Sequence, residues 1–353
     1  MLSRDEYLKL PLEQRFIPLG EAKAARANRL FDDLPTVDLH THIFGSLHFS
    51  FDYELVRAIG VTGLFEAVPA VDEDFDESIR LLGKYKGLVA LQPGLISATR
   101  AEEIRRAKRE GKQAVLYQLE PQTIGRDLNR LDIAYGLGFR MMLLTFNTKI
   151  YLGDGCAERT DCGLSYLGIE VVRRLNELGV MIDLSHCGIQ TSLDTCKHSK
   201  SPVLFNHVGA RALNPPCKRL KTDEQIRAVA DTGGLIGICA IPNQLSRNPE
   251  QGVEDMLKHI EYVAKLVGID HVAIGLDNVF GDQVGHHRQM AATNIVNLER
   301  SGIVLAADYM YGIESPLEWR NIVRGLVSRG FSDEEITKIV SGNALRVIEQ
   351  VVG

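Results

Sequence analysis

Two histidines end the first apolar segment of this chain, Val-Asp-Leu-His-Thr-His at residues 37–42. On a β-strand, residues two apart point to the same side, so His40 and His42 would share one face with Asp38. Paired imidazoles at this spacing are suitable ligands for a divalent metal ion. Two hydrogen-bonded polar side chains at a strand end are the alternative, and this segment alone does not decide between the two.

Further ligand-type side chains follow apolar segments elsewhere in the sequence. They are Glu120, His186, His207 and Asp277. One such residue by itself is more often a helix cap or a hydrogen-bonded core residue. If these segments are strands of one parallel barrel, however, their carboxyl ends meet at one mouth, where unpaired polar and charged groups are costly. A metal ion removes that cost, and we therefore predict a metal centre at this mouth.

The number of ligands predicts two metal ions, because a single catalytic zinc takes about three protein ligands. The chain offers more than that: His40, His42, Glu120, His186 and His207. We expect two divalent ions, with zinc as the first choice and Glu120 as the bridge between them. A hydroxide bridging the ions would attack a carbonyl group. Asp277 is then left over to serve as general base and acid, so that Asp277 and Glu120 are the predicted catalytic residues.

Short apolar segments that alternate with amphipathic ones would supply the scaffold. The expected strands cover residues 37–39, 62–68, 114–119, 141–145, 180–184, 202–205, 235–240 and 272–275. The expected helices cover residues 100–110, 164–178, 222–232, 253–266 and 332–352, and a ninth apolar run at 87–90 is expected to form a short excursion. Eight strands in this alternation predict an α/β fold with a closed parallel sheet, the (β/α)8 or TIM barrel. We expect one domain, residues 1–353, with residues 1–35 as a helical extension.

The composition narrows the function classes. Hydrophobic residues make up 45% of the chain, enough for one large core, and the net charge of -6 argues against binding to nucleic acid or a membrane surface. No apolar run is long enough to span a membrane, and the charged first residues lack the apolar stretch of a secretory signal. We therefore expect a soluble cytoplasmic protein whose partner is a small molecule. A homodimer stays open.

The six cysteines are too few for a disulfide scaffold in a chain of 353 residues. We expect free thiols. For Cys156 and Cys162, which flank a polar segment, a local disulfide or an additional metal ion is the alternative.

The order and spacing of these residues resemble the renal or membrane dipeptidases, zinc dipeptidases of peptidase family M19 in the amidohydrolase superfamily. The resemblance runs from about residue 35 to 351 and is strongest at residues 100–120, 138–147, 175–186, 202–234 and 332–347. It implies a TIM barrel of the metal-dependent amidohydrolase type that hydrolyses dipeptides with two zinc ions. The family's ligands and catalytic aspartate match, in order, His40, His42, Glu120, His186, His207 and Asp277. The arginine that holds the substrate carboxylate matches Arg219.

The chain departs from the family pattern mainly where the substrate would lie. His42 replaces an aspartate of the first metal pair, which keeps the site able to bind metal but changes its charge. Phe146 replaces a histidine that contacts the substrate carbonyl, and Val279 replaces an aspartate that follows the catalytic one. Residues 121–123 replace a glycine-rich segment. We expect a hydrolase of a peptide or amide bond in a small substrate. Hydrolysis of a cyclic amide, lactam or N-acyl amino acid on the same two-metal site is the alternative.

Two rival functions are less well supported. The segment Asp-Leu-His-Thr-His resembles the opening motif of the polymerase-and-histidinol-phosphatase-type phosphoesterases, but these need further histidine and aspartate ligands after the second strand, and residues 60–71 contain none. A barrel that binds metals without catalysis would not need a spare carboxylate such as Asp277.

Several other polar residues have two interpretations. The pair His286 and His287 either reaches the mouth or lies in a solvent-exposed loop, which we prefer, and His48 has the same alternatives. Asp38 and Asp183 either orient metal-binding histidines or make structural hydrogen bonds.

Overall fold

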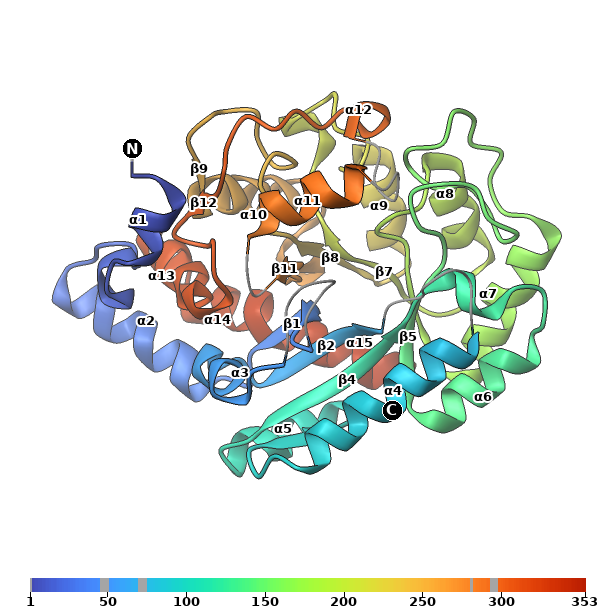
Figure 1. The fold of residues 1–353 in the computed structure, drawn as a ribbon, viewed down its shortest axis with the longest axis horizontal. Coiled ribbons are helices and arrows are strands. Elements are labelled where there is room, and N and C mark those ends of the chain that lie inside the picture. The colour runs from blue at the N-terminus through green and yellow to red at the C-terminus, as the bar shows by residue number, and fades with distance from the viewer. Residues whose placement is uncertain (1, 45–50, 69–74, 280–281, 293–297) are drawn as a thin grey trace.

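The computed structural model describes residues 2–44, 51–68, 75–279, 282–292 and 298–353, and its centre is a parallel β-sheet surrounded by helices (Figure 1). All eight predicted strands are present, with ends that differ by a few residues from the prediction. They are β1 (Val37–His42), β2 (Gly63–Val68), β4 (Gln113–Leu119), β5 (Phe139–Leu143), β6 (Met181–Asp183), β7 (Val203–Val208), β8 (Leu235–Ile238) and β10 (Val272–Ile274). Every residue of β2, β4 and β7 is buried, as expected for strands covered on both faces.

The sheet closes on itself. Its strand order is β10-β8-β7-β6-β5-β4-β2-β1-β11, and all of these pairs are parallel. The two end strands, β10 and β11 (Asn278–Val279), are separated in the chain only by residues 275–277. Because β10 pairs with β8 and β11 pairs with β1, this one stretch of chain joins the two edges. The predicted (β/α)8 barrel is confirmed, and β3 (Leu95–Ser97) is an additional strand that pairs with β4.

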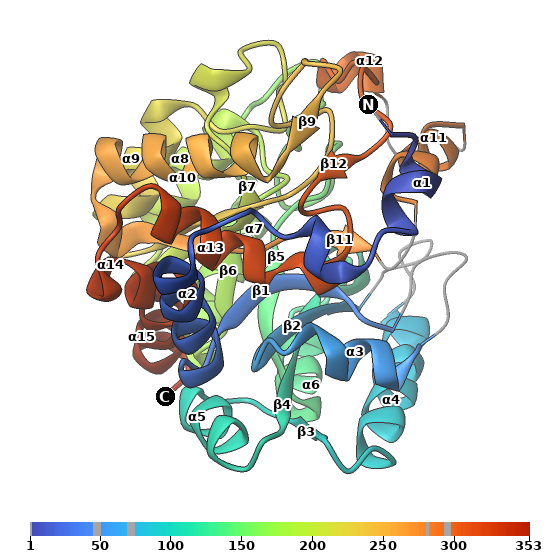
Figure 2. The same cartoon turned by 90° about the vertical axis from the view of Figure 1, so that its left-hand side faces the viewer.

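Helices cover the outside of the barrel (Figures 1 and 2). They are α3 (Tyr53–Ile59), α4 (Phe75–Ala90), α5 (Ala101–Arg109), α6 (Asn129–Leu137), α7 (Tyr166–Leu178), α8 (Ile189–His198), α9 (Asp223–Asp231), α10 (Val253–Val267), α11 (Gln283–Ala292), α12 (Leu298–Ser301), α13 (Arg320–Ser328), α14 (Asp333–Thr337) and α15 (Asn343–Val351). A small separate sheet pairs β9 (Gln251–Gly252) with β12 (Met310–Tyr311). No helix among the described residues is long and apolar enough to cross a membrane.

Two predictions about helices were wrong in detail. The apolar run at residues 87–90 belongs to α4, and the additional strand comes later, at β3. The expected helix 332–352 is divided by a π-helical turn, Lys338–Gly342, between α14 and α15. The hydroxyl of Ser341, within this turn, donates a hydrogen bond to the carbonyl of Pro35, so a tertiary contact accompanies the irregular turn. The predicted start is confirmed, since the Ser332 side chain accepts a hydrogen bond from the Glu335 amide.

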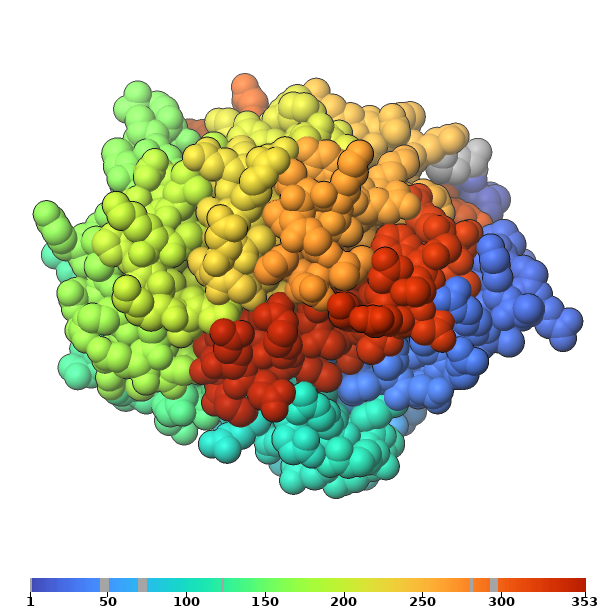
Figure 3. Space-filling view, turned by 180° about the vertical axis from the view of Figure 1, so that it is seen from behind, coloured from blue at the N-terminus to red at the C-terminus, as the bar shows by residue number. Residues whose placement is uncertain are grey.

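The first residues form α1 (Arg4–Leu8), a 3-10 turn (Leu12–Arg15) and α2 (Glu21–Asp33), which lies beside α13 in Figure 2. Buried Glu318 binds this segment, accepting hydrogen bonds from the Tyr7 hydroxyl at 2.8 Å and the Arg15 guanidinium at 2.9 Å. From behind, the C-terminal residues (red) lie between the N-terminal residues (blue), the segment around α5 and the segment around α10 (Figure 3). Both ends of the chain are therefore packed against the barrel.

Two glycines, Gly237 and Gly275, allow the backbone to pass close to the Asn206 carbonyl of β7. A Cβ atom added at Gly275 would lie 1.8 Å from the main-chain carbonyl oxygen of Asn206 in β7, and one at Gly237 would lie 2.1 Å from the same oxygen. Gly237 is in β8, which pairs with β7, whereas Gly275 follows β10, which does not pair with β7. Neither backbone can move away from Asn206 without distorting the barrel. These two positions therefore exclude every residue larger than glycine.

We predict that Gly275→Ala destabilises the fold by at least about 2 kcal/mol, because the methyl group must displace a strand. The matched control is Gly83→Ala, at an exposed position of α4 where nothing lies within 4 Å of the added Cβ. Alanine there should be neutral or stabilising, since it is the better helix former. The measurement is the unfolding midpoint in denaturant. Equal midpoints for the two variants would contradict the close approach.

Candidate active site

The six candidate residues lie at the carboxyl ends of the barrel strands. His40 and His42 are in β1 and His207 is in β7, while Glu120 follows β4, His186 follows β6 and Asp277 follows β10. The Nε2 atom of His42 is 3.0 Å from Asp277 Oδ1, that of His40 is 3.5 Å from the same oxygen, and that of His207 is 3.7 Å from Oδ2. The mouth of the barrel thus brings together the residues that the sequence singled out.

Asp277 lies at the centre of this group. It is the residue before β11, where the chain joins the two edges of the sheet, and its φ of 53° is in the left-handed region that a non-glycine side chain adopts only under constraint. Its amide donates a hydrogen bond to the carbonyl of His40 at 3.1 Å. Burial raises the pKa of its carboxyl group, but the hydrogen bond from His42 and the nearby imidazoles outweigh burial and lower the pKa to about 2. The carboxylate is therefore ionised at neutral pH.

Three of the four histidines at this mouth have lowered pKa values, whereas the Asp277 carboxylate raises the pKa of His42 against the effect of burial. Burial lowers the pKa of His40 to about 4. Burial and the positive charge of Arg219 hold the pKa of His186 well below its ordinary value, and burial and the neighbouring basic groups do the same for His207. Neutral imidazole is the form that binds a metal ion, so no proton needs to be removed from these three rings at neutral pH.

Two of the neutral rings face each other through unprotonated nitrogens. His186 Nδ1 donates to the Asn147 side-chain oxygen at 2.8 Å, and His207 Nδ1 donates to the Asn206 side-chain oxygen. The single proton of each neutral ring is thereby placed on Nδ1, so both Nε2 atoms carry lone pairs. These atoms are 3.1 Å apart. Two lone pairs at this distance repel each other unless a cation binds them.

A divalent metal ion fits this arrangement. His40, His207 and Asp277 have ligand atoms that all lie within 4.8 Å of one another. Nitrogen and carboxylate oxygen are the donors that zinc prefers. Asp277, which the sequence analysis assigned as the general base, faces the same space as the Nε2 atoms of His40 and His207. The geometry therefore gathers a metal-binding donor set around Asp277.

Glu120, the expected bridge, is partly buried beside this group. Burial raises the pKa of its carboxyl group to about 8, and the nearby Asp183 carboxylate raises it further than the His42 ring lowers it. A carboxylate in this position needs a compensating positive charge to stay ionised, which a bound cation would provide.

The chain matches the sequence pattern of the membrane dipeptidases, peptidase family M19, over residues 24–290. It belongs to this family. It is 28% identical over 258 residues to dipeptidase tcpJ of Claviceps purpurea, a match that covers 72% of this chain and 55% of that protein. It is 30% identical over 219 residues to an uncharacterised Klebsiella pneumoniae protein in the pqqA 5' region, covering 57% of this chain and 75% of that protein. The chain spans only about half the length of the first relative.

A solved structure of an amidohydrolase from Pseudomonas aeruginosa has the same fold. Its TM-score is 0.82 at 27% identity, and the match covers 93% of this chain and 99% of that one. Membership in the family, and the amidohydrolase type of barrel that the sequence predicted, are thus confirmed.

Arg219, the residue that the family resemblance assigned to a substrate carboxylate, already has partners in the protein. Its side chain is buried, and its guanidinium donates hydrogen bonds to the main-chain carbonyls of Ser185 and, at 3.1 Å, His207. These carbonyls belong to the segments that carry two candidate ligands. Arg219 therefore ties the end of β6 to the end of β7, and its role toward a substrate stays a prediction.

Phe146 packs on a candidate ligand. Its ring stacks on the His186 ring, with centroids 4.2 Å apart and planes 17° apart. The next residue, Asn147, holds Nδ1 of the same imidazole. The segment that the family uses for a substrate contact therefore supports His186 in this chain.

Asp38 and Asp183 do not contact the rings of the histidines. Asp38 accepts hydrogen bonds from the amides of His40 and Leu276 and from the Trp319 indole. Asp183 accepts hydrogen bonds from Ser185 and from the Asn206 amide. Of the two interpretations, structural hydrogen bonding is the one that the structure shows, because main-chain and side-chain donors near the strand ends take these oxygens. The ring contacts come instead from Gln118, Asn206 and Asn147, which the sequence analysis missed.

The histidine pair His286 and His287 lies in helix α11, and the Asp277 carboxylate is close enough to His287 to act on the pKa of its ring, which burial lowers. Because His287 is helical and buried, the preferred solvent-exposed loop was wrong. The side chain of Asp282 caps the start of α11 by accepting a hydrogen bond from the Gly285 amide. Gly285 is therefore part of the first helical turn and not of a loop. Cys156 and Cys162 are free thiols, as expected. His48 lies outside the described residues.

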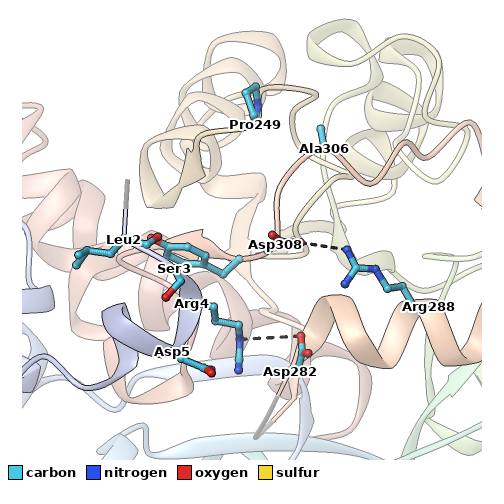
Figure 4. A pocket seen from close by; sticks show the side chains of 10 residues that line it. Leu2, Ser3, Arg4, Asp5, Pro249, Asp282, Arg288, Ala306 and Asp308 are labelled. Carbon is cyan, nitrogen blue, oxygen red and sulfur yellow. Dashed lines mark hydrogen bonds and ion pairs between the residues drawn. The ribbon is translucent and has the colours of Figure 1, made fainter.

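A pocket of about 480 Å³ beside the N-terminal segment contains none of the six candidate residues (Figure 4). Four of its five charged side chains pair with each other, Arg288 with Asp308 at 3.0 Å and Arg4 with Asp282 at 3.9 Å. The mouth of the barrel remains the better candidate, because its donor atoms converge while most of the charged groups of the pocket are already paired.

We predict that Arg219→Met destabilises the protein by about 2 kcal/mol or more, because it leaves two buried carbonyls without donors. Lys218→Met is the matched control, since it makes the same kind of change at the neighbouring, exposed position. The free energy of unfolding from denaturant titration is the measurement. If Arg219→Met were as stable as the control, the guanidinium would not hold the strand ends together.

Proposed function

We propose that this chain is a two-metal hydrolase that cleaves the amide bond of a dipeptide or a similar small substrate. His40, His42, Glu120, His186 and His207 would hold two divalent cations, with zinc as the first choice. The proposal rests on the facing Nε2 atoms of His186 and His207, which are 3.1 Å apart. Beside them lies the Asp277 carboxylate, which the imidazoles of His40, His42 and His207 approach. Membership in the dipeptidase family supports this assignment.

The chemistry that such cations supply when bound is polarisation of a carbonyl group and a lower pKa for water. The chain's own residues do the rest. Asp277 is ionised and faces the Nε2 atoms of His40, His42 and His207, so it can accept the proton that an attacking water loses. The same carboxyl group can then give that proton to the nitrogen of the leaving amine. Its constrained backbone holds the carboxylate in this position.

The substrate class follows from the family and from the local change at Phe146. The relative from Claviceps purpurea is called a dipeptidase, which supports a dipeptide as substrate. Phe146 cannot donate a hydrogen bond to a carbonyl oxygen, and its stacking on His186 makes that side of the mouth apolar. This favours a compact substrate with an apolar group at that side, and N-acyl amino acids or cyclic amides are the second candidate. A cytoplasmic location and a homodimer remain predictions from the sequence.

We predict that zinc-reconstituted protein hydrolyses members of a panel of dipeptides, N-acyl amino acids and cyclic amides, and that Asp277→Asn lowers kcat by about 10²-fold or more, because an amide cannot carry the proton. The control is Asp282→Asn, an exposed carboxylate at the start of α11, which should leave kcat unchanged. Amine release is the measurement, with metal content determined in parallel. Near-normal turnover by Asp277→Asn at full metal content would exclude Asp277 as the proton carrier.

A further inference from the structure

We propose that the side-chain amides of Gln118 and Asn206 are positioning residues that set the tautomers of His40 and His207 and so aim their Nε2 atoms at the metal site. The inference rests on the proposed function, because it assigns a role toward bound metal. It concerns two residues that are buried beneath the candidate ligands and that no resemblance singled out.

The orientation of the Asn206 amide is fixed independently of any histidine. Its Nδ2 donates to the main-chain carbonyl of Leu39 at 3.2 Å and to Gln118 Oε1 at 2.7 Å. The opposite atom, Oδ1, therefore faces His207 Nδ1 and the Ser185 hydroxyl, which lies 2.8 Å away. An oxygen can only accept, so the proton of neutral His207 must be on Nδ1.

The Gln118 amide is fixed in the same way by Asp183. Its Nε2 donates to Asp183 Oδ2 at 3.3 Å, which leaves Oε1 facing His40 Nδ1 at 3.2 Å. The other oxygen of Asp183 accepts hydrogen bonds from the main-chain N–H groups of Ser185 and Asn206 and from the Ser185 hydroxyl, so the carboxylate cannot turn. Asp183 thus acts on the His40 ring through Gln118, and not by touching it.

Asn206 is the residue common to both rings. Its Nδ2 also lies 3.1 Å from His40 Nδ1, but the two Nδ2 protons go to Leu39 and Gln118, so the Nδ1 proton of His40 is left to Gln118 Oε1. The rings of His40 and His207 stack with centroids 3.9 Å apart. Gln118, in contrast, contacts only the ring of His40. Removing the Asn206 amide should therefore disturb ligands from both β1 and β7, whereas removing the Gln118 amide should disturb only the ligand from β1.

Without the acceptors Gln118 Oε1 and Asn206 Oδ1, the proton of His40 or of His207 could move from Nδ1 to Nε2. His40 Nε2 is 3.5 Å and His207 Nε2 is 3.7 Å from an oxygen of Asp277. A proton moved to Nε2 would point at this carboxylate and would occupy the lone pair that a metal ion needs. The two amides therefore keep Nε2 available.

The first test determines the tautomers in the full-length, metal-free protein with ¹⁵N-labelled histidine, by two-bond ¹H–¹⁵N NMR correlation. In the unsubstituted protein, His40 and His207 should both carry the proton on Nδ1. Asn206→Ala should give His207 a population protonated on Nε2, and Gln118→Met should do the same for His40 alone. A folded Asn206→Ala variant in which His207 keeps its proton on Nδ1 would overturn the proposal.

The second test measures zinc dissociation constants by competition with a chelator. Loss of such a hydrogen-bond partner typically weakens metal binding by about 10- to 100-fold. We expect this for both ions in Asn206→Ala and for one ion in Gln118→Met. Unchanged affinities in both folded variants would count against the proposal.

The matched control is Gln113→Met, at the other end of β4. Gln113 is equally buried, and its amide donates to the carbonyls of Val56 and Val61, so the same substitution removes comparable hydrogen bonds away from the histidines. It should change neither the tautomers nor the zinc affinity. An equal loss of zinc affinity in Gln113→Met would show a general structural effect and contradict the positioning role.

The outcomes separate this proposal from the proposed function. If the unsubstituted protein binds no zinc, the two-metal function is wrong, but the tautomers still decide whether the amides direct the rings. If Asn206→Ala does not fold, Gln118→Met decides alone, because a proton retained on His40 Nδ1 would overturn the assignment.

Discussion

The repulsion between two neutral imidazoles governs the mouth of this barrel. His186 and His207 direct lone pairs at each other across 3.1 Å because their protons are held on the far side of the rings. In a buried environment such repulsion is weakly screened, and protonating either ring is opposed by burial and by Arg219. A cation is the remaining way to stabilise the arrangement. The neighbouring carboxylates, which on their own would be costly to bury, become favourable ligands or proton carriers once that cation is bound.

The barrel can hold these groups at such short distances because it closes at the site itself. Residues 275–277 connect the two edges of the sheet, and Asp277 lies in this connection with a constrained backbone. Gly275 allows the chain to pass against the carbonyl of Asn206. The side chain of the same asparagine holds His207 and lies against His40. The closure of the fold and the positions of the candidate ligands therefore depend on the same few residues.

Much of this was predictable from the sequence. Strand periodicity places His40 and His42 on one face, and the rule that parallel strand ends meet at one mouth brings Glu120, His186, His207 and Asp277 to the same place. Both inferences require only the two-residue period of a strand and the parallel barrel topology. The sequence analysis did not predict the division of the C-terminal helix at residues 338–342, which a tertiary contact of Ser341 accompanies. It also did not predict the helix that contains His287, because the cap by Asp282 was not considered.

The partners of the imidazole rings were also not predicted, although a signal was present. Gln118 lies two residues before Glu120, and Asn206 is the polar residue directly before His207 in β7. A buried amide at such a position needs partners, which is a reason to look for hydrogen bonds near a ligand. Which ring each amide contacts depends on the register between β1, β4 and β7, and this information comes only from the structure.

The central claim is that the facing imidazoles bind divalent cations. Anomalous diffraction from crystals of the zinc-reconstituted protein, recorded on both sides of the zinc absorption edge, tests it most directly. We predict two zinc peaks at the barrel mouth, with the Nε2 atoms of His186 and His207 among the ligands. Zinc bound only outside this mouth, or no zinc at all with the two rings still facing each other, would contradict it.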